Sequence, residues 1–224
     1  MEVNNPLYKK QGIHVISSIF TVEDGVTKVL LIKRKNNPYK DMWALVGGAL
    51  YNNEDLIDGV KREIFEKSGI KDIDIYFSSV FGSINRSPVM RMVAISYIGV
   101  IDSKRVAILK DTLKTSNSDW FPIDMIPKLA YDHNEILESS LENLKLRITE
   151  TDILKSLFPN GFVIPEIQMV YESILKKNFD RRNFRKKLLS TGIVEDTNKV
   201  RVFEGKKPAK IYKFKNSKII KNVF

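Results

Sequence analysis

Two neighbouring side chains at the start of a predicted helix, Arg182 and Asn183, carry the hydrogen-bonding groups that read DNA bases. An arginine can donate two hydrogen bonds to O6 and N7 of guanine, and an asparagine can pair with N6 and N7 of adenine. Asp180 is the predicted N-cap, because its carboxylate suits the free N–H groups of the first turn. If Phe184 and Leu188 turn inward at i and i+4, Arg182 and Asn183 face outward. The spacing predicts a helix that presents base-reading groups to a major groove.

Basic side chains surround this pair on the same helix and on a predicted β-hairpin beyond it. On the helix, Lys186 shares the outward face, Arg185 lies on its flank, and Arg181 lies nearer the packed side, suited to phosphates. In the hairpin, lysines cluster at a tight Gly/Pro turn, as expected for contact with phosphates or a minor groove. The predicted DNA-contacting residues are Arg181, Arg182, Asn183, Arg185, Lys186, Lys206, Lys207 and Lys210. The alternative is a solvated basic helix face.

The net charge of the chain is concentrated in its last third. Residues 150–224 hold 17 Lys and Arg against 8 Asp and Glu, a net charge of +9, whereas residues 1–149 hold 20 against 19, a net of +1. Positive charge confined to one segment favours a polyanionic partner such as DNA. A generic basic surface is the alternative explanation, and the positions of the basic residues argue against it.

A second group of residues, in segment 48–70, has spacing suited to metal-dependent chemistry. The residues that fall on one pattern are Gly48, Glu54, Arg62, Glu63, Ile64, Glu66, Gly69 and Ile70. This segment resembles the Nudix box, in which Gly, five residues, Glu, seven residues and Arg-Glu-x-x-Glu-Glu-x-Gly form a loop–helix–loop. The resemblance implies a helix that aims carboxylates at Mg²⁺ ions, which bind a diphosphate and activate water.

One position of this Nudix-like box (residues 48–70) departs from the pattern. Lys67 stands where the family has its second consecutive Glu, a principal metal ligand, and Val46 replaces the usual Pro before the double Gly. An ammonium group removes one oxygen ligand and repels a divalent cation. Glu63 and Glu66 remain as vestigial ligands, and Lys67 can pair with one of them. The sequence predicts a Nudix fold without hydrolytic activity, bound metal or cofactor; an active Nudix hydrolase with a nucleic-acid-binding domain is the alternative.

Hydrophobic periodicity places the box in a mixed first domain, predicted over residues 1–148. The expected strands cover residues 14–20, 27–34, 43–46, 73–81 and 90–101, and the expected helices cover 53–68 and 136–146. Gly25 lies in the turn between the first two strands and predicts a hairpin. Gly69 sits where the C-cap of the first helix is expected. The expected architecture is α+β, with an α/β/α sandwich in this Nudix-like domain.

The second predicted domain, residues 149–224, has the element order of a winged helix-turn-helix. Helices are expected at 151–157, 165–175 and 181–189, followed by strands at 199–203 and 210–214. The expected core of this domain consists of Phe162, Ile167, Val170, Tyr171, Ile174, Phe184, Leu188, Ile193, Val194, Val202, Tyr212 and Phe214. Its aromatic residues are predicted to pack rather than to stack on bases, because no exposed aromatic pair stands on a strand.

The two halves together resemble the Nudix-related transcriptional regulators. The resemblance rests on the Nudix-like box, on Glu166-Ile-Gln-Met-Val-Tyr-Glu172, on Asp180-Arg-Arg-Asn-Phe-Arg-Lys-Lys-Leu-Leu189, and on Gly205-Lys-Lys-Pro-Ala-Lys-Ile-Tyr212. It covers essentially the whole chain. It implies a homodimer that binds a palindromic operator in double-stranded DNA, acts mostly as a repressor, and changes its DNA affinity when a small molecule binds the Nudix-like domain.

The effector remains open between two classes within this resemblance. Nucleotide-sensing members respond to ADP-ribose or related nucleotides, and another branch responds to L-arabinose. The degraded box and the absence of the first arginine of an Asp-Pro-Arg-Gly-Arg stretch in Ser87-Pro-Val-Met-Arg91 favour arabinose, with ADP-ribose as the alternative. Trp43, Glu63 and Arg91 are the predicted effector contacts. Each also has a structural explanation: core packing for Trp43, pairing with Arg62 for Glu63, and a strand surface for Arg91.

Composition narrows the remaining possibilities. The chain has no cysteine and two histidines, His14 and His133, so disulfides, thiolate-bound metals and a histidine-rich metal site are excluded or disfavoured. Both histidines are expected to be ordinary packing or surface residues. No secretory signal is evident at the N-terminus, and the longest nearly apolar run, residues 92–101, is too short for a bilayer. We expect a cytoplasmic protein without a membrane partner.

Overall fold

The computed structural model describes residues 5, 7, 9–202 and 207–215. It divides into two compact units, each described separately below. The first unit comprises the chain up to Phe20, Lys28–Gly99 and Lys104–Leu141; the second comprises Thr21–Thr27, Val100–Ser103 and the chain from Glu142 on. Within the described part of the chain, no helix has both the length and the hydropathy that a membrane crossing requires.

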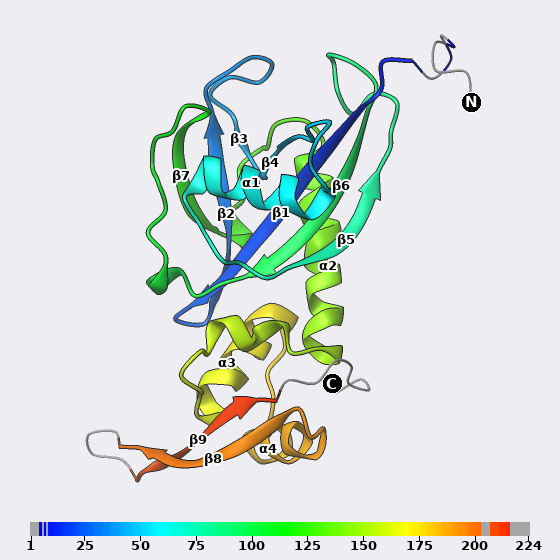
Figure 1. The fold of residues 1–224 in the computed structure, drawn as a ribbon. Helices are drawn as coiled ribbons and strands as arrows, with labels where there is room; N and C mark the ends of the chain where they lie inside the picture. The colour runs from blue at the N-terminus through cyan, green and yellow to red at the C-terminus, as the bar shows by residue number, and fades with distance from the viewer. Residues whose placement is uncertain (1–4, 6, 8, 203–206, 216–224) are drawn as a thin grey trace. The chain divides into compact units, whose positions relative to one another are not determined.

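A seven-stranded sheet forms the centre of the first fold (Figure 1). Its strands are β1 (Gly12–Glu23), β2 (Val26–Arg34), β3 (Trp43–Ala44), β4 (Val46–Ala49), β5 (Ile75–Phe81), β6 (Met92–Val100) and β7 (Thr115–Pro122). Five of them follow the order β3-β2-β1-β6-β5, while β4 pairs with β1 and β7 pairs with β2. Between β1 and β2, Asp24 and Gly25 have φ angles of 49° and 78°, which are the left-handed conformations that a tight hairpin turn needs. The predicted hairpin is confirmed.

Helix α1 (Leu56–Ser68) carries most of the Nudix-like box and packs on the sheet. Val60 and Ile64 are buried one turn apart, and Gly69, with φ of 76°, donates its backbone N–H to the carbonyl of Phe65 at 2.8 Å. The predicted C-cap at Gly69 is therefore confirmed. The sheet lies between α1 and helix α2 (His133–Glu150) in Figure 1, which is the predicted α/β/α arrangement. Ser18 on β1 donates a hydrogen bond to Ser140 on α2 at 3.0 Å.

The second unit contains the 3-10 helix η3 (Ile153–Leu157), α3 (Ile164–Leu175), α4 (Arg181–Ser190), β8 (Val194–Arg201) and β9 (Ala209–Phe214). Strands β8 and β9 pair antiparallel as a two-stranded sheet. Two shorter 3-10 helices, η1 (Ser103–Arg105) and η2 (Ile123–Met125), lie earlier in the chain. The element order is the predicted winged helix-turn-helix.

The core of the second unit agrees with the prediction except at two residues. Tyr171, Phe162 and Phe184 are fully buried, whereas Val202 is 72% exposed and Phe214 is half-buried. The expected helix at 151–157 is a short 3-10 helix, because Pro159 disfavours helical backbone in the residue before it and leaves too few residues for a stable α-helix. Strand β8 begins five residues earlier than the expected strand; Phe203 lies outside the described residues.

Two further elements of the first fold differ from the prediction. The strand expected at 43–46 is split: β3 pairs with β2 and β4 pairs with β1. Strand β7 was not predicted, because its sequence Thr-Ser-Asn-Ser-Asp-Trp-Phe-Pro has few apolar residues. The predicted domain boundary at 148/149 falls in the last turn of α2.

Candidate functional site

Helix α4 is fixed by its cap and by two buried side chains. Oδ1 of Asp180 accepts hydrogen bonds from the backbone N–H groups of Arg182 (3.1 Å) and Asn183 (2.9 Å). Phe184 and Leu188 are buried, and every other side chain of the helix is exposed. The capping bonds satisfy donors that the first turn would otherwise leave free. The predicted orientation of α4, with Arg182 and Asn183 facing outward, is what the structure shows.

The turn between α3 and α4 is held by one carboxylate and one amide. Oε1 of Glu172 accepts from Nε2 of Gln168 (2.9 Å) and from the backbone N–H of Phe179 (2.8 Å). The same Nε2 of Gln168 also donates to the carbonyl of Phe179 at 2.8 Å. Because these bonds join the last turn of α3 to the residue before the N-cap of α4, they set the direction in which α4 leaves the turn.

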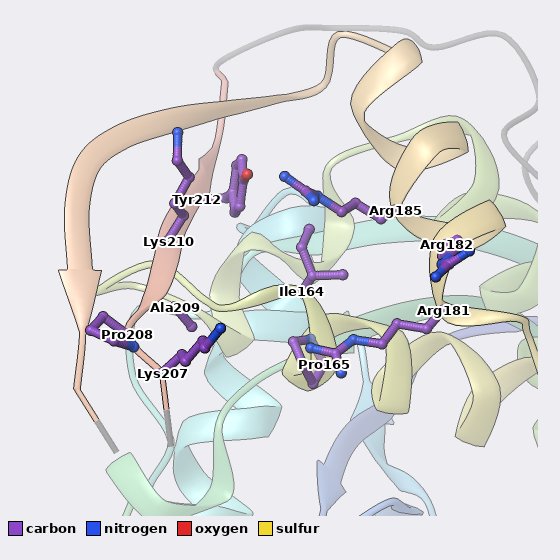
Figure 2. Close-up of a pocket in the computed structure, with 10 residues that line it drawn as sticks. All are labelled: Ile164, Pro165, Arg181, Arg182, Arg185, Lys207, Pro208, Ala209, Lys210 and Tyr212. Carbon is purple, nitrogen blue, oxygen red and sulfur yellow. The ribbon is translucent and has the colours of Figure 1, made fainter. Parts of the chain in front are cut away.

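A basic groove of about 530 Å³ opens between α4, the start of α3 and the β8–β9 hairpin (Figure 2). Its lining residues are Ile164, Pro165, Arg181, Arg182, Arg185, Lys207, Pro208, Ala209, Lys210 and Tyr212. Figure 2 shows Arg181 and Arg185 extending from α4, and Lys207 from the opposite side, toward the same space. Five of the predicted DNA-contacting residues thus share one groove. Such a concentration of cations beside a helix that projects Asn183 suits a duplex phosphate backbone.

Lys210 is engaged with a carboxylate of its own hairpin. Its Nζ lies 2.7 Å from Oδ2 of Asp196, and this hydrogen bond raises the pKa of Lys210 and lowers the pKa of Asp196. Because an exposed ion pair contributes little net stability, a phosphate can compete with Asp196 for Lys210. The structure places Asn183 and Lys186 on the exposed face of α4 outside the lining of the groove; Lys206 lies outside the described residues.

In the Nudix-like box, Arg62 is the centre of an ion-pair cluster. Its Nε and Nη2 donate to the two carboxylate oxygens of Glu54 at 2.8 and 2.6 Å, and its Nη1 lies 2.6 Å from Oε1 of Glu63. The guanidinium carbon lies 3.8 Å from the centre of the Tyr51 ring. The hydrogen bonds from Arg62 lower the pKa of Glu54 to about 2. Glu54 and Glu63 are therefore bound to an internal cation.

Lys67 provides a second internal cation at the same cluster. It is buried on α1; its Nζ lies 3.0 Å from Oε2 of Glu63 and also donates to the carbonyl oxygen of Gly47. Burial alone would raise the pKa of Glu63, but Lys67 and Arg62 outweigh burial and lower it. Burial lowers the pKa of Lys67 itself, and the charge of Glu63 opposes that shift. The predicted pairing of Lys67 with a vestigial carboxylate is confirmed.

Lys114, from the segment before β7, completes the cluster. Its Nζ lies 2.6 Å from Oε2 of Glu66 and 3.5 Å from Oε1 of Glu63. Gly48 lets the carboxylate of Glu63 approach the backbone, because a Cβ at this position would stand 2.2 Å from Cδ of Glu63. Three carboxylates that a Nudix box would offer to metal ions are thus paired with three side-chain cations.

This arrangement does not fit Mg²⁺. The ion needs about six oxygen ligands at ~2.0–2.1 Å, of which proteins usually supply one or two carboxylates. The ammonium of Lys67 lies 3.0 Å from Oε2 of Glu63, where it competes for that oxygen and repels a divalent cation. Among the residues that the structure describes, no group of three or more His, Cys, Asp or Glu side chains has an arrangement that could hold a metal ion. The Nudix-like box keeps its fold and its carboxylates, and internal ammonium and guanidinium groups occupy the positions around them.

Each of the three predicted effector contacts has a structural partner. Trp43 packs edge-on against Phe121, with ring centroids 4.6 Å apart. Arg91 donates from Nη1 to the carbonyls of Gly82 (2.7 Å) and Ser83 (3.0 Å). Glu63 is held in the ion-pair cluster described above. The roles of Trp43, Glu63 and Arg91 as effector contacts remain predictions.

The first unit contains a cavity that the sequence analysis did not identify. It measures about 160 Å³ and is lined by His14, Arg86, Ser87, Val89, Met90, Met92, Tyr131 and His133. These residues come from three separate segments of the chain, so their spacing in the sequence gave no indication of a shared cavity. Both histidines of the chain line it.

Fold and sites together define a class: a Nudix-fold domain whose box does not fit a metal ion, followed by a winged helix-turn-helix with a basic groove. Comparisons with known proteins agree with this class. Residues 12–142 match the family described as NUDIX domain, and residues 154–214 match the family described as NrtR DNA-binding winged helix domain.

Three relatives are similar over large parts of the chain. The ADPR responsive transcriptional repressor NtrR of Acinetobacter baylyi is 32% identical over 211 residues, which cover 92% of this chain and 83% of that protein. The crystal structure of Shewanella oneidensis NrtR complexed with a 27mer DNA has a TM-score of 0.76 and 26% identity, covering 91% of this chain and 93% of that one. The NUDIX domain of Shewanella oneidensis NrtR, cocrystallised with ADP ribose, has a TM-score of 0.57 and 27% identity, covering 64% and 94% respectively.

The chain belongs to the NrtR family of DNA-binding regulators, in which a Nudix domain precedes a winged helix domain. The expected resemblance to Nudix-related transcriptional regulators is confirmed at this level. The expectation of an arabinose-responsive type is not supported: of the relatives described above, one is named as responsive to ADPR and one was cocrystallised with ADP ribose. The degraded box, which favoured arabinose, therefore does not exclude a nucleotide.

Proposed function

We propose that this protein is an ADP-ribose-responsive DNA-binding repressor. The main support is the basic groove beside α4. It occurs in a chain that resembles an ADPR responsive transcriptional repressor over 92% of its length. The first 148 residues would sense the effector and dimerise, and residues 149–224 would bind DNA. Effector binding would change the affinity for DNA, so the two ligands are thermodynamically coupled.

In this proposal α4 enters the major groove of an operator. Arg182 and Asn183 contact base edges from the exposed first turn of the helix, and Lys186 extends along the same face. Arg181, Arg185 and Lys207 contact phosphates from the groove. A homodimer would place two such helices on the two halves of a palindrome, about one helical turn apart.

We also propose that the Nudix domain senses without hydrolysing. The support is Lys67, whose ammonium contacts Glu63 and replaces the carboxylate that would complete a metal site. The domain would then bind a diphosphate without the metal ions that activate water in a hydrolase.

The alternative is an active Nudix hydrolase that uses its basic domain to hold a nucleic acid. It is favoured by Glu54, Glu63 and Glu66, which keep the spacing of the box. Formation of AMP and ribose 5-phosphate from ADP-ribose with Mg²⁺ or Mn²⁺ separates the two functions. The regulator predicts no turnover by the wild-type chain and partial turnover after Lys67→Glu; brisk wild-type turnover supports the hydrolase.

The direct test of the proposed function combines DNA and effector. Duplex sequences selected by the protein from a random pool provide an operator, and gel-shift titrations give its affinity with and without ADP-ribose. We expect a selected palindrome that binds at least a thousandfold more tightly than random duplex, and an affinity that changes when ADP-ribose is added. Selection of no sequence, or an affinity unaffected by ADP-ribose, contradicts the proposal.

A further inference from the structure

A carboxylate at the start of α3 is joined to the last residue of strand β8. Oε2 of Glu166 accepts the backbone N–H of Val163 at 2.9 Å, which caps the first turn of α3. The other oxygen, Oε1, accepts a hydrogen bond from Nη1 of Arg201. Nη2 of Arg201 also donates to the carbonyl of Gly161 at 3.4 Å. Glu166 therefore uses one oxygen to cap its own helix and the other in an ion pair with the hairpin.

The β8–β9 hairpin is irregular between its base and its outer end. At the base, Phe162 and Tyr212 exchange two backbone hydrogen bonds of 2.8 Å, which tie β9 to the segment before α3. Further along, Asp196 pairs with Tyr212 and Val200 pairs with Lys210, so four residue steps on β8 lie opposite two on β9. A bulge of this kind bends the strand and interrupts the ladder, so the base does not by itself fix the direction of the outer end.

The outer end of the wing consists of residues 200–202 and 207–210 among those that the structure describes. Arg201 lies in this part and stands opposite Ala209 in the β8–β9 ladder. Its ion pair with Glu166 therefore joins the start of α3 to the hairpin on the far side of the bulge. This contact sets where the outer end lies relative to α3.

The outer end supplies the hairpin's lysines to the basic groove. Lys207 and Lys210 both line the groove, and Lys207 extends into it from the side opposite α4 (Figure 2). Neither Glu166 nor Arg201 is among the residues that line it. The ion pair can thus affect the groove through the position of the lysines rather than by direct contact with what the groove binds.

We propose that Glu166 is a positioning residue for DNA binding, which acts through Arg201 to hold the outer end of the wing where Lys207 meets the phosphate backbone. The inference rests on the proposed function as a DNA-binding protein and adds the contact that places the wing. It predicts the sign of a charge change. By charge alone, removing an anion near a DNA site strengthens binding to a polyanion. Loss of the positioning contact weakens binding instead.

Glu166→Gln separates these two effects. The substitution removes the charge and keeps an amide oxygen that can still accept the N–H of Val163. We expect DNA affinity to fall about 3-fold to 10-fold at about 0.15 M salt, and the slope of log affinity against log salt to fall by about 0.9, as for the loss of one lysine–phosphate contact. The matched control is Glu195→Gln, which removes a carboxylate of the same hairpin that pairs with Lys213 at 3.0 Å. It should leave the affinity unchanged or raise it.

A double-mutant cycle with Lys207→Ala gives a result that a loss of stability alone would not produce. In the wild-type protein Lys207→Ala removes a phosphate contact, whereas in the Glu166→Gln background that contact is already lost. Lys207→Ala should therefore change the affinity by less than about twofold in this background. Arg201→Gln leaves the cap of α3 intact and should abolish the effect of Lys207→Ala in the same way. If Arg201 itself contacted a phosphate, the effects of Arg201→Gln and Lys207→Ala would multiply.

Fluorescence-anisotropy titrations of the full-length protein with a selected operator measure all of these affinities, and thermal melting checks that each variant folds. Unchanged or tighter binding by Glu166→Gln overturns the inference and leaves the proposed function standing. A full effect of Lys207→Ala in both the Glu166→Gln and the Arg201→Gln backgrounds also overturns it, even where Glu166→Gln lowers the melting temperature. If the wild-type protein selects no operator, the proposed function and this inference fail together.

Discussion

Replacing Lys67 by Met removes the internal cation that neutralises the buried carboxylate of Glu63. The Nζ of Lys67 lies 3.0 Å from Oε2 of Glu63, whose side chain is 3% exposed. Removing one partner of a buried ion pair costs about 3–5 kcal/mol, because the other charge stays buried. Glu63 keeps Arg62 at 2.6 Å and Lys114 at 3.5 Å. We therefore expect a loss of about 3 kcal/mol in the free energy of unfolding, at the lower end of that range.

Urea unfolding followed by tryptophan fluorescence measures this loss of unfolding free energy in the first unit of the structure. The chain has two tryptophans, Trp43 and Trp120, and both lie in the first unit, so their fluorescence reports its unfolding within the whole protein. The matched control is Lys61→Met, which changes an exposed lysine of the same helix and is expected to stay within about 0.5 kcal/mol of wild type. Equal effects of the two substitutions, or none from Lys67→Met, would refute the assignment of Lys67 as the counter-ion of Glu63.

The destabilisation caused by Lys67→Met should also depend on pH. Lys67 and Arg62 hold the pKa of Glu63 below its ordinary value, so its ionised form stabilises the fold above about pH 4.5, and that contribution is lost as the pH falls through the lowered folded-state pKa. Without Lys67, burial shifts the pKa of Glu63 upward, and protonation relieves the unpaired charge. The destabilisation by Lys67→Met should therefore be larger at pH 7 than at pH 4. A destabilisation that is constant with pH would mean that lost packing, not lost charge, is the cause.

Three further predictions concern the winged helix. In gel-shift titrations, Arg182→Ala should cost about 1–3 kcal/mol in operator affinity and relax specificity at one base position. The control Lys213→Ala, whose ammonium pairs with Glu195 at 3.0 Å, should change the affinity little. Unchanged operator affinity after Arg182→Ala would exclude α4 as the recognition helix. Lys207→Ala should weaken all sequences alike and reduce the slope of log affinity against log salt by about 0.9, and an unchanged slope would contradict a phosphate contact. Asp180→Ala should lower the thermal stability of the second unit by about 0.5–2 kcal/mol, because two backbone N–H groups lose their acceptor; calorimetry that shows no change would contradict the cap.

The fold of the winged helix was predictable because it depends on residue patterns within short segments of the sequence. The i, i+4 spacing of Phe184 and Leu188 fixed which face of α4 is buried, and Asp180 fixed where the helix begins. Val202 was misassigned to the core because it follows the last residue of β8, so the alternation of strand faces no longer applies to it. Local sequence patterns thus predicted the short helix α4 well, whereas they predicted the end of strand β8 poorly.

Long-range features of the first unit were less predictable. Strand β7 forms by pairing with β2, nearly 90 residues earlier in the chain. Its polar sequence lacks the alternation of apolar and polar residues that indicates a strand. The pairing of Lys67 with a box carboxylate could be predicted, because the two residues are four apart on one helix. The contribution of Lys114 could not, because only tertiary folding brings its segment to Glu66. The cavity around His133 was missed for the same reason.

The ammonium of Lys67 is a counter-ion joined to the chain by covalent bonds. A dissociable ion exchanges with its surroundings, and its occupancy rises and falls with the free concentration outside. Lys67 cannot leave the carboxylate it serves, so that charge stays neutralised in a chelator solution as it does in millimolar magnesium. In the proposed regulator, the response to the effector would then not depend on the supply of divalent ions.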